Sequence, residues 1–320
     1  MDEVLFLNPV FKEKIWGGQE LKKFDYDLPK GDIGECWAIS GHAHGTNTVA
    51  NGTFVGQTVA QLWATQRSLF DDMPGDRFPL LTKILDAEAS LSVQVHPGDA
   101  YAAEHANDLG KTECWYIIDA KPGAYLIFGH HAKTKAEFET MVQNGQWDAL
   151  LRKQSVKKGD FVYVPSGTVH ALNAGIIALE SQQSSDTTYR LYDYDRVDAT
   201  TGKKRELHLQ DAYNVTQIPF APVAANTTTQ KAGASTLITL VSEPVSEYFN
   251  VYHWLIKDKV DFNKQYPFTL VSVLDGQGTL TIDQQTYPLH KGQHFILTAY
   301  AKHWTLDGDL DCIASVPGKA

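Results

Sequence analysis

Short stretches of alternating apolar and polar residues recur along the chain, and this spacing constrains the fold more than any other feature. A period of two gives a β-strand one apolar face, whereas a helix needs a period near 3.6. Many such stretches joined by scattered Gly and Pro residues favour a mainly all-β architecture over a parallel α/β sheet. We expect two jelly rolls. The clearest are residues 91–96, 114–120, 124–129, 161–165, 268–274, 278–283 and 294–299.

Helical spacing is confined to a few segments. Apolar residues recur at helical intervals in residues 57–70 and 134–151. Thr134 is expected to cap the second of these helices, with Glu137 three residues later. A shorter helix is expected after Pro97. The sequence therefore predicts a β protein with a few short helices.

Composition and charge exclude several classes of partner. The chain has 320 residues and a net charge of −10, which argues against nucleic acid or an anionic membrane as partner. No apolar run is long enough to span a bilayer, and the N-terminus lacks a signal-peptide pattern. The three cysteines are too few and too far apart for a disulfide framework, so we expect a cytoplasmic protein.

The strongest local pattern is G-x5-P-x-G-x2-H, filled by Gly159, Pro165, Gly167 and His170. It resembles the second motif of the cupin superfamily. Gly159 turns the chain into a strand, Pro165 ends regular pairing, and Gly167 allows a tight turn that returns His170 toward the mouth of the barrel. The alternative is an ordinary hairpin with an incidental histidine.

The spacing of this motif occurs twice in the chain. Gly159 precedes His170 by the same number of residues as Gly292 precedes His303. A match this short could arise by chance, but two stacked jelly rolls explain it better.

The segment 221–234 is small, polar and weakly patterned, as expected of a linker. We therefore predict a catalytic cupin domain over residues 1–225, with an N-terminal extension and small helical insertions. Residues 235–320 are predicted to form a degenerate, cupin-like jelly roll without a metal.

A polar strand face precedes the motif. Gln94 and His96 point to one face of the stretch 91–96, opposite Leu91, Val93 and Val95. Such a face fits a strand that lines a cavity, although an exposed edge strand would show the same pattern.

Glu113 enters an apolar strand, where a carboxylate is costly to bury unless it is paired or binds a metal. With His96 and His170 it would complete a common set of ligands for a first-row divalent metal, and the Gln94 amide oxygen is a tolerable fourth ligand. The remaining histidines considered are expected at the surface, namely His42, His44, His105, His130 and His131. No nucleophile elbow and no phosphate-binding glycine loop is present in the sequence.

Several collinear blocks closely resemble type I phosphomannose isomerases: PVFKEKIWGG, IGECWAIS, PLLTKILDAEASLSVQVHPGDAYA, GKTECWYIIDA, GTVHAL and SSDTTYRLYDYDR. They cover the N-terminal two-thirds, and the short length fits the compact bacterial class. The resemblance implies interconversion of mannose 6-phosphate and fructose 6-phosphate with one Zn²⁺ per chain, and it leaves the oligomeric state open.

The resemblance also implies roles for individual residues. Gln94, His96, Glu113 and His170 would face the metal, with Gln94 the weakest ligand. Lys111 and Arg190 would be catalytic, and Lys83 would support substrate binding.

Chemical reasoning leaves alternatives at two of these positions. Burial beside a cation would lower the pKa of Lys111 and make it a base, although it could instead bind phosphate. Arg190 could stabilise an enediolate or form a structural ion pair with an aspartate such as Asp186, Asp193 or Asp195.

Two other functional classes compete with the isomerase. One is another metal-dependent cupin enzyme, either an oxygenase or a sugar epimerase; the other is a non-catalytic, sugar-sensing cupin. The acidic charge and the lack of a helix-turn-helix pattern count against a sensor that binds DNA.

Overall fold

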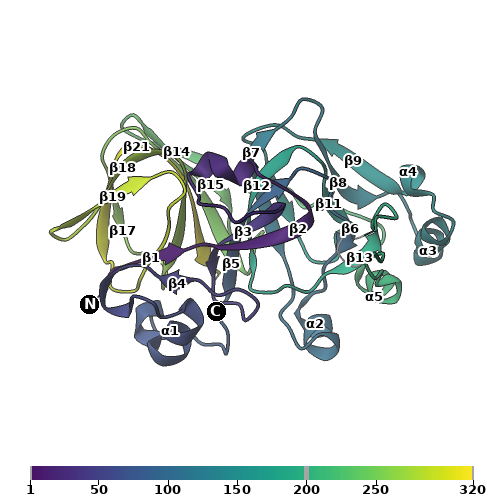
Figure 1. The fold of residues 1–320 in the computed structure, drawn as a ribbon, viewed down its shortest axis with the longest axis horizontal. Coiled ribbons are helices and arrows are strands. Elements are labelled where there is room, and N and C mark those ends of the chain that lie inside the picture. The colour runs from purple at the N-terminus through teal and green to yellow at the C-terminus, as the bar shows by residue number, and fades with distance from the viewer. Residues whose placement is uncertain (1, 198–201, 319–320) are drawn as a thin grey trace.

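The computed structural model describes residues 2–197 and 202–318, and its named strands form three antiparallel sheets (Figure 1). Two sheets belong to the part of the chain before residue 193, and the third is built largely from the C-terminal part. The mainly-β architecture predicted from the alternating stretches is confirmed.

The first two sheets face each other across a buried apolar layer that includes Trp115 and Val162 from one sheet and Leu126 and Leu172 from the other. The six-stranded sheet has the order β10 (Phe161–Val164), β7 (Glu113–Ala120), β12 (Ile176–Gln183), β5 (Leu80–Ala87), β3 (Ile33–Ser40) and β2 (Val10–Gly18). The five-stranded sheet has the order β13 (Tyr189–Tyr192), β6 (Val93–Val95), β11 (His170–Leu172), β8 (Tyr125–His130) and β9 (Leu151–Ser155).

The third sheet has ten strands and includes the start of the chain. Its order is β14 (Thr228–Ala232), β15 (Ser235–Val241), β16 (Phe249–Ile256), β21 (His303–Pro317), β18 (Thr269–Ile282), β20 (His294–Leu297), β1 (Val4–Asn8) and β4 (Thr48–Val49). Two further strands pair off this path, β17 (Val260–Asn263) with β21 and β19 (Gln285–His290) with β18. Because β1 pairs with β20, this sheet crosses the division predicted near residues 225–235.

The helices lie at the edges of the sheets (Figure 1). They are η1 (Glu20–Phe24), η2 (Gly52–Phe54), α1 (Val59–Thr65), η3 (Arg67–Phe70), α2 (Asp99–His105), α3 (Lys135–Gln143), α4 (Trp147–Leu150) and α5 (Leu209–Val215). Within the described residues, every helix is too short to cross a membrane.

Both long predicted helices are interrupted. Residues 57–70 form α1 and η3, which are separated at Gln66, and residues 134–151 form α3 and α4, with Gly145 between them at φ 64°. The predicted cap is confirmed, because Thr134 Oγ1 accepts a hydrogen bond from the Glu137 backbone N–H at 3.2 Å. The short helix predicted after Pro97 is α2.

Two predictions about strands were wrong. The stretches 268–274 and 278–283 lie, except for their outer residues, in one 14-residue strand, β18, which continues through Gly276. Its irregularity opposite β21 falls between Val273 and Asp275. The predicted linker 221–234 contains β14, an exposed edge strand paired with β15. An edge strand exposed on both faces has no apolar periodicity, which explains why the sequence pattern does not predict this strand.

The largest buried cluster joins both parts of the chain. Phe268 of the C-terminal part contacts Phe78 at 5.3 Å and Phe70 at 5.4 Å between ring centroids. Ser181 of β12 and Ser315 of β21 are also hydrogen bonded, at 2.7 Å. The sheet holding the candidate site is therefore packed firmly against the C-terminal sheet.

Candidate metal centre and active site

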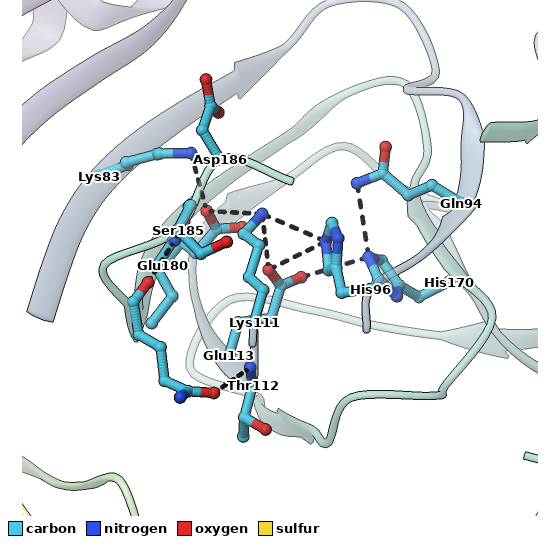
Figure 2. Close-up of polar contacts among 12 residues, drawn as sticks. Lys83, Gln94, His96, Lys111, Thr112, Glu113, His170, Glu180, Ser185 and Asp186 are labelled. Atoms are coloured by element: carbon cyan, nitrogen blue, oxygen red, sulfur yellow. Dashed lines mark hydrogen bonds and ion pairs between the residues drawn. The ribbon is translucent and has the colours of Figure 1, made fainter. Parts of the chain in front are cut away.

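Three predicted ligands converge between the two facing sheets (Figure 2). Glu113 begins β7 of the six-stranded sheet, whereas His96 follows β6 and His170 begins β11 of the five-stranded sheet. The Nε2 atoms of His96 and His170 lie 3.4 and 3.3 Å from the carboxylate oxygens of Glu113. All three side chains are buried.

Backbone carbonyls fix the orientation of both imidazole rings. His96 Nδ1 lies 2.9 Å from the Thr187 carbonyl oxygen, and His170 Nδ1 lies 2.8 Å from that of Thr168. Each Nδ1 therefore donates its proton, and each Nε2 keeps a lone pair directed toward Glu113. This arrangement is typical of metal-binding histidines.

The ionisation states of the three residues suit metal binding. Burial lowers the pKa of His96 to about 3, and burial also lowers the pKa of His170, so both rings are neutral near pH 7. Burial opposes ionisation of Glu113, but the Lys111 ammonium group outweighs burial and holds the pKa of this carboxyl well below its ordinary value. A neutral, neutral and anionic set is the form that coordinates a divalent cation.

Within the part of the chain that the structure describes, neither carboxylate oxygen of Glu113 makes a hydrogen bond of good geometry, although Lys111 Nζ lies 3.0 Å from Oε2. Buried carboxylate oxygens without such partners are costly, and a cation would satisfy them. The residues present therefore fit a divalent metal.

Gln94 lies beside the three ligands but presents the wrong atom. Its amide Nε2 is 3.4 Å from His170 Nε2, while its Oε1 accepts a hydrogen bond from Ser92 Oγ at 3.2 Å. The amide must rotate to offer its oxygen to a metal. Strand β6, which holds Gln94, lies between β11 and β13. Gln94 is therefore in register with His170 on one side and with Arg190 on the other.

A cavity of about 320 Å³ opens beside the candidate ligands. Lys83, Gln94, Lys111 and Arg190 all line it, so the structure brings four of the predicted residues to one cavity. The other basic side chains on the lining are Lys14 and Arg205. Such a concentration of positive charge in an acidic protein creates a local site for an anion.

The pKa of Lys111 is raised by the protein's own charges, whereas the expected lowering combined burial with the charge of a bound cation. Its Nζ lies 3.1 Å from His96 Nε2 and 4.0 Å from Glu180. Burial alone would lower the pKa of Lys111, but the charges of Glu113 and Glu180 outweigh burial and raise it. The protein's own charges therefore favour an ammonium group at this position.

Lys83 is buried between carboxylates. Its Nζ lies 3.5 Å from Glu180 and 4.0 Å from Glu35, and it sits 5.0 Å from the ring centre of Trp37. Figure 2 shows it on the Glu180 side of Lys111, away from the histidines. Its charge is thus largely compensated within the protein.

Arg190 makes no ion pair with a carboxylate among the described residues. The three aspartates considered as partners are engaged elsewhere, Asp186 with His44 at 3.0 Å, Asp193 with Arg205 at 2.6 Å and Asp195 with Lys204 at 2.6 Å. Within the described residues, Arg190 Nε is buried without a hydrogen-bond partner. Burial and the nearby Arg205 lower the pKa of Arg190.

Comparison with known proteins decides the family. The model of the type I phosphomannose isomerase catalytic domain matches residues 4–116, and that of the mannose-6-phosphate isomerase cupin domain matches residues 239–317. Mannose-6-phosphate isomerase ManA of Bacillus subtilis (strain 168) is 50% identical over 98% of this chain and 98% of its own length. The chain belongs to the type I phosphomannose isomerase family.

Solved structures of phosphomannose isomerases share the fold. The mannose 6-phosphate isomerase from Bacillus subtilis aligns over 98% of this chain and 99% of its own with a TM-score of 0.95 and 47% identity. A mannose 6-phosphate isomerase described as zinc-bound aligns over 100% of each chain with a TM-score of 0.75. That second protein is only 14% identical, so the likeness supports the fold alone.

Sequence reasoning missed two buried acids that line the cavity of this isomerase-family chain. Glu180 of β12 pairs in register with Lys83, and Glu35 of β3 lies 3.2 Å from Lys14. Burial and the charge of Glu113 raise the pKa of Glu180, whereas Lys83 and Lys14 outweigh the effect of burial and lower that of Glu35. The signal that pointed to Glu113, an acid within an apolar strand, was present at both positions.

Two histidines predicted at the surface are buried. His42 forms an edge-on contact with Trp37 at 5.8 Å, and the Nε2 atom of His130 lies 3.0 Å from the Gln217 carbonyl oxygen. Neither belongs to the cluster of candidate ligands identified among the described residues. The glycines around His42 indicate an exposed loop, and the adjacency of His130 to His131 indicates side chains that face opposite ways, but tertiary contacts cover both rings.

Proposed function

We propose that the chain interconverts mannose 6-phosphate and fructose 6-phosphate. The observation that carries the proposal is the buried His96, Glu113 and His170 cluster, which Lys111 joins to a cavity rich in basic side chains. Membership of the phosphomannose isomerase family supports the same activity. Aldose–ketose isomerisation of this pair moves a proton between C1 and C2 through an enediolate, whose negative charge must be stabilised.

The proposed cofactor is one Zn²⁺ per chain, held by His96, Glu113 and His170, with the rotated Gln94 amide as a fourth ligand. When bound, zinc would supply Lewis-acid polarisation of the sugar oxygens. The Nδ1 bonds to Thr187 and Thr168 hold the imidazoles in place before any ligand arrives.

Lys111 and Arg190 are proposed to act on charge that develops at the reacting oxygens. Lys111 approaches the cavity from the six-stranded sheet, and Arg190 approaches it from the five-stranded sheet. Preorganised cationic donors on two sides of the cavity would stabilise an enediolate without reorientation. The assignment of Lys111 as a base receives no support from its raised pKa.

The proposed substrate carries a phosphate because the cavity gathers basic side chains in a protein of net charge −10. Lys83 remains a proposed contributor to substrate binding. Its positive charge offsets the negative charges of Glu180 and Glu35, which would otherwise repel a phosphate. Phosphate binding would hold the sugar so that C1 and C2 lie near the candidate ligands.

We also propose a cytoplasmic location. All three cysteines, Cys36, Cys114 and Cys312, are free and buried. Free thiols persist in a reducing compartment, which supports this location.

Removal and replacement of the metal tests the proposed function. Chelator-treated protein should lose isomerase activity and regain it with added Zn²⁺. The replenished enzyme should have a much larger kcat/KM for mannose 6-phosphate than for free mannose, because phosphate binding positions the reacting carbons. Full activity after complete metal removal, or equal kcat/KM values for the two sugars, would contradict the proposal.

A further inference from the structure

A second cavity lies in the C-terminal sheet, outside the candidate active site. It has a volume of about 470 Å³ and is lined by residues of β14, β15, β16, β17 and β21. None of its lining residues lines the basic cavity beside the candidate metal ligands. Its volume is typical of a small-molecule site.

Aromatic side chains form part of its wall. Phe262 stacks on Trp304 with ring centroids 5.7 Å apart and planes 7° from parallel, and it lies 4.6 Å from the ring of Trp254. The hydroxyls of Tyr252 and Tyr266 lie 2.7 Å apart on the same lining. Aromatic faces carry partial negative charge, and they pack well against the slightly positive C–H groups of a sugar ring.

The polar groups of this cavity are almost all neutral. Among its lining residues, which all lie in the described part of the chain, Asp261 is the one charged side chain. The remaining polar lining consists of Thr, Asn, Gln and Tyr side chains, which can both donate and accept hydrogen bonds. The cavity therefore differs from the basic one beside the candidate ligands, and the Asp261 carboxylate would repel a phosphate.

Trp304 forms part of the cavity wall through its ring. The residue is buried, and its ring stacks on that of Phe262. The wall at this place is therefore a rigid aromatic surface.

The place of this cavity in the fold matches the internal repeat. His303, aligned with the candidate metal ligand His170, begins β21 next to Trp304, and its Nδ1 lies 2.5 Å from Asn263 Oδ1. Asn263 lines the cavity. The second jelly roll thus keeps an opening near the repeated histidine but surrounds it with aromatic and amide groups.

We propose that this cavity binds a neutral sugar, such as an unphosphorylated hexose or a hexoside. The aromatic walls would contact the C–H face of the ring, and the amides of Asn263 and Gln265 on the lining would bind its hydroxyls. The proposal is independent of the isomerase activity, and it would give the C-terminal jelly roll a ligand of its own.

Isothermal titration with methyl α-D-mannopyranoside tests the site, because the blocked anomeric carbon prevents turnover. The titration is made on the whole protein with mannose 6-phosphate and fructose 6-phosphate present at saturating, equilibrated concentrations, so that the basic cavity is occupied. Phe262→Ala removes one aromatic wall. Tyr287→Ala is the matched control, since this half-buried aromatic residue packs in the same jelly roll but lies outside the cavity.

The proposal predicts saturable binding that Phe262→Ala weakens at least tenfold and Tyr287→Ala leaves within twofold. Both variants should keep the kcat for mannose 6-phosphate, which separates this result from a failure of the proposed isomerase function. Because Phe262→Ala could disturb folding, Thr239→Trp, which fills the cavity from β15, should also abolish binding. Absence of saturable binding, or binding unchanged in Phe262→Ala and Thr239→Trp, would overturn the proposal. The proposal would also be overturned if the natural protein were a dimer and these variants were monomers, because a second copy of the chain would then be the occupant of the cavity.

Discussion

Arg190 shows how one basic side chain that forms no ion pair with a described carboxylate can serve substrate binding. It lines the basic cavity, its Nε lacks a hydrogen bond among the described residues, and the aspartates near it in sequence pair with other side chains. A guanidinium held in this way is available to a substrate, because no carboxylate in the described part of the chain forms an ion pair with it.

Arg190→Lys should therefore lower kcat by about 10²–10³, the effect of losing a preorganised donor, because lysine keeps the charge but loses the planar fork. The melting temperature and metal content should barely change. Steady-state kinetics and thermal unfolding of the same preparation provide the measurement.

Arg196→Lys is the matched control, since Arg196 is bonded to Asp193 and to the Ser90 carbonyl oxygen and does not line the cavity. It should lower the melting temperature and leave kcat unchanged. A near-native kcat combined with a sharply lower melting temperature in Arg190→Lys would show that Arg190 has a structural role instead.

His294 should make stability depend on pH. Its ring is buried between Tyr26, whose hydroxyl lies 2.6 Å from Nε2, and Ser272, whose Oγ lies 2.9 Å from Nδ1. Burial lowers the pKa of His294 to about 3. Because the pKa is lower in the folded state, the stabilising effect is complete above the unfolded pKa near 6.5 and is lost as pH falls toward 3.

Between pH 7.5 and pH 5, this residue alone should cost the protein about 2 kcal/mol of unfolding free energy. His294→Gln should be less stable than the natural protein at pH 7.5, and the gap should narrow by about that amount at pH 5. Urea unfolding at the two pH values measures the change. A gap that is the same at both would mean that His294 does not titrate differently on folding.

The residues of the candidate site could be predicted in part. Glu113 and His170 follow from an acid in an apolar strand and from a glycine–proline motif, and the family resemblance adds Lys111 and Arg190. The proximity of Gln94, His170 and Arg190 depends on the order of β6, β11 and β13, which no local pattern specifies. In the same way, the pairing of the Lys83 charge with Glu180 and Glu35 depends on the register of neighbouring strands.

At the scale of elements, β18 shows why glycine is an ambiguous signal. Gly276 interrupts the alternation as a turn would, yet it lies within a continuous strand at φ 87°. A Cβ at this position would meet the Asp309 carbonyl oxygen at 2.0 Å. The residue is thus required for close strand approach, and sequence alone does not distinguish this use from a turn.

Gly276→Ala should accordingly destabilise the protein by about 2–4 kcal/mol, the sum of backbone strain and overpacking. Gly233→Ala is the control, because Gly233 also has a positive φ, 60°, but a Cβ there meets nothing within 4 Å. It should cost only about 1 kcal/mol. Equal losses in the two variants, measured by denaturant unfolding, would argue against the steric explanation.

At the scale of the whole molecule, the two predicted jelly rolls are joined more closely than the linker pattern indicated. Strand β1 completes the C-terminal sheet, and Phe268 packs among aromatic residues from the first part of the chain. Sequence periodicity reports the burial of each strand but not which distant strand it pairs with. The mainly-β class was therefore predictable, whereas the pairing of the N-terminal strand β1 with the C-terminal sheet was not.

Metal content measured together with activity tests the central claim most directly. The purified protein should contain one divalent metal per chain, and His96→Ala and His170→Ala should each lose metal and isomerase activity together. His303→Ala, at the repeated position in the C-terminal jelly roll, should keep both because its exposed ring bonds Asn263 and lies outside the ligand cluster found among the described residues. Stoichiometric metal retained in both His96→Ala and His170→Ala would contradict the account.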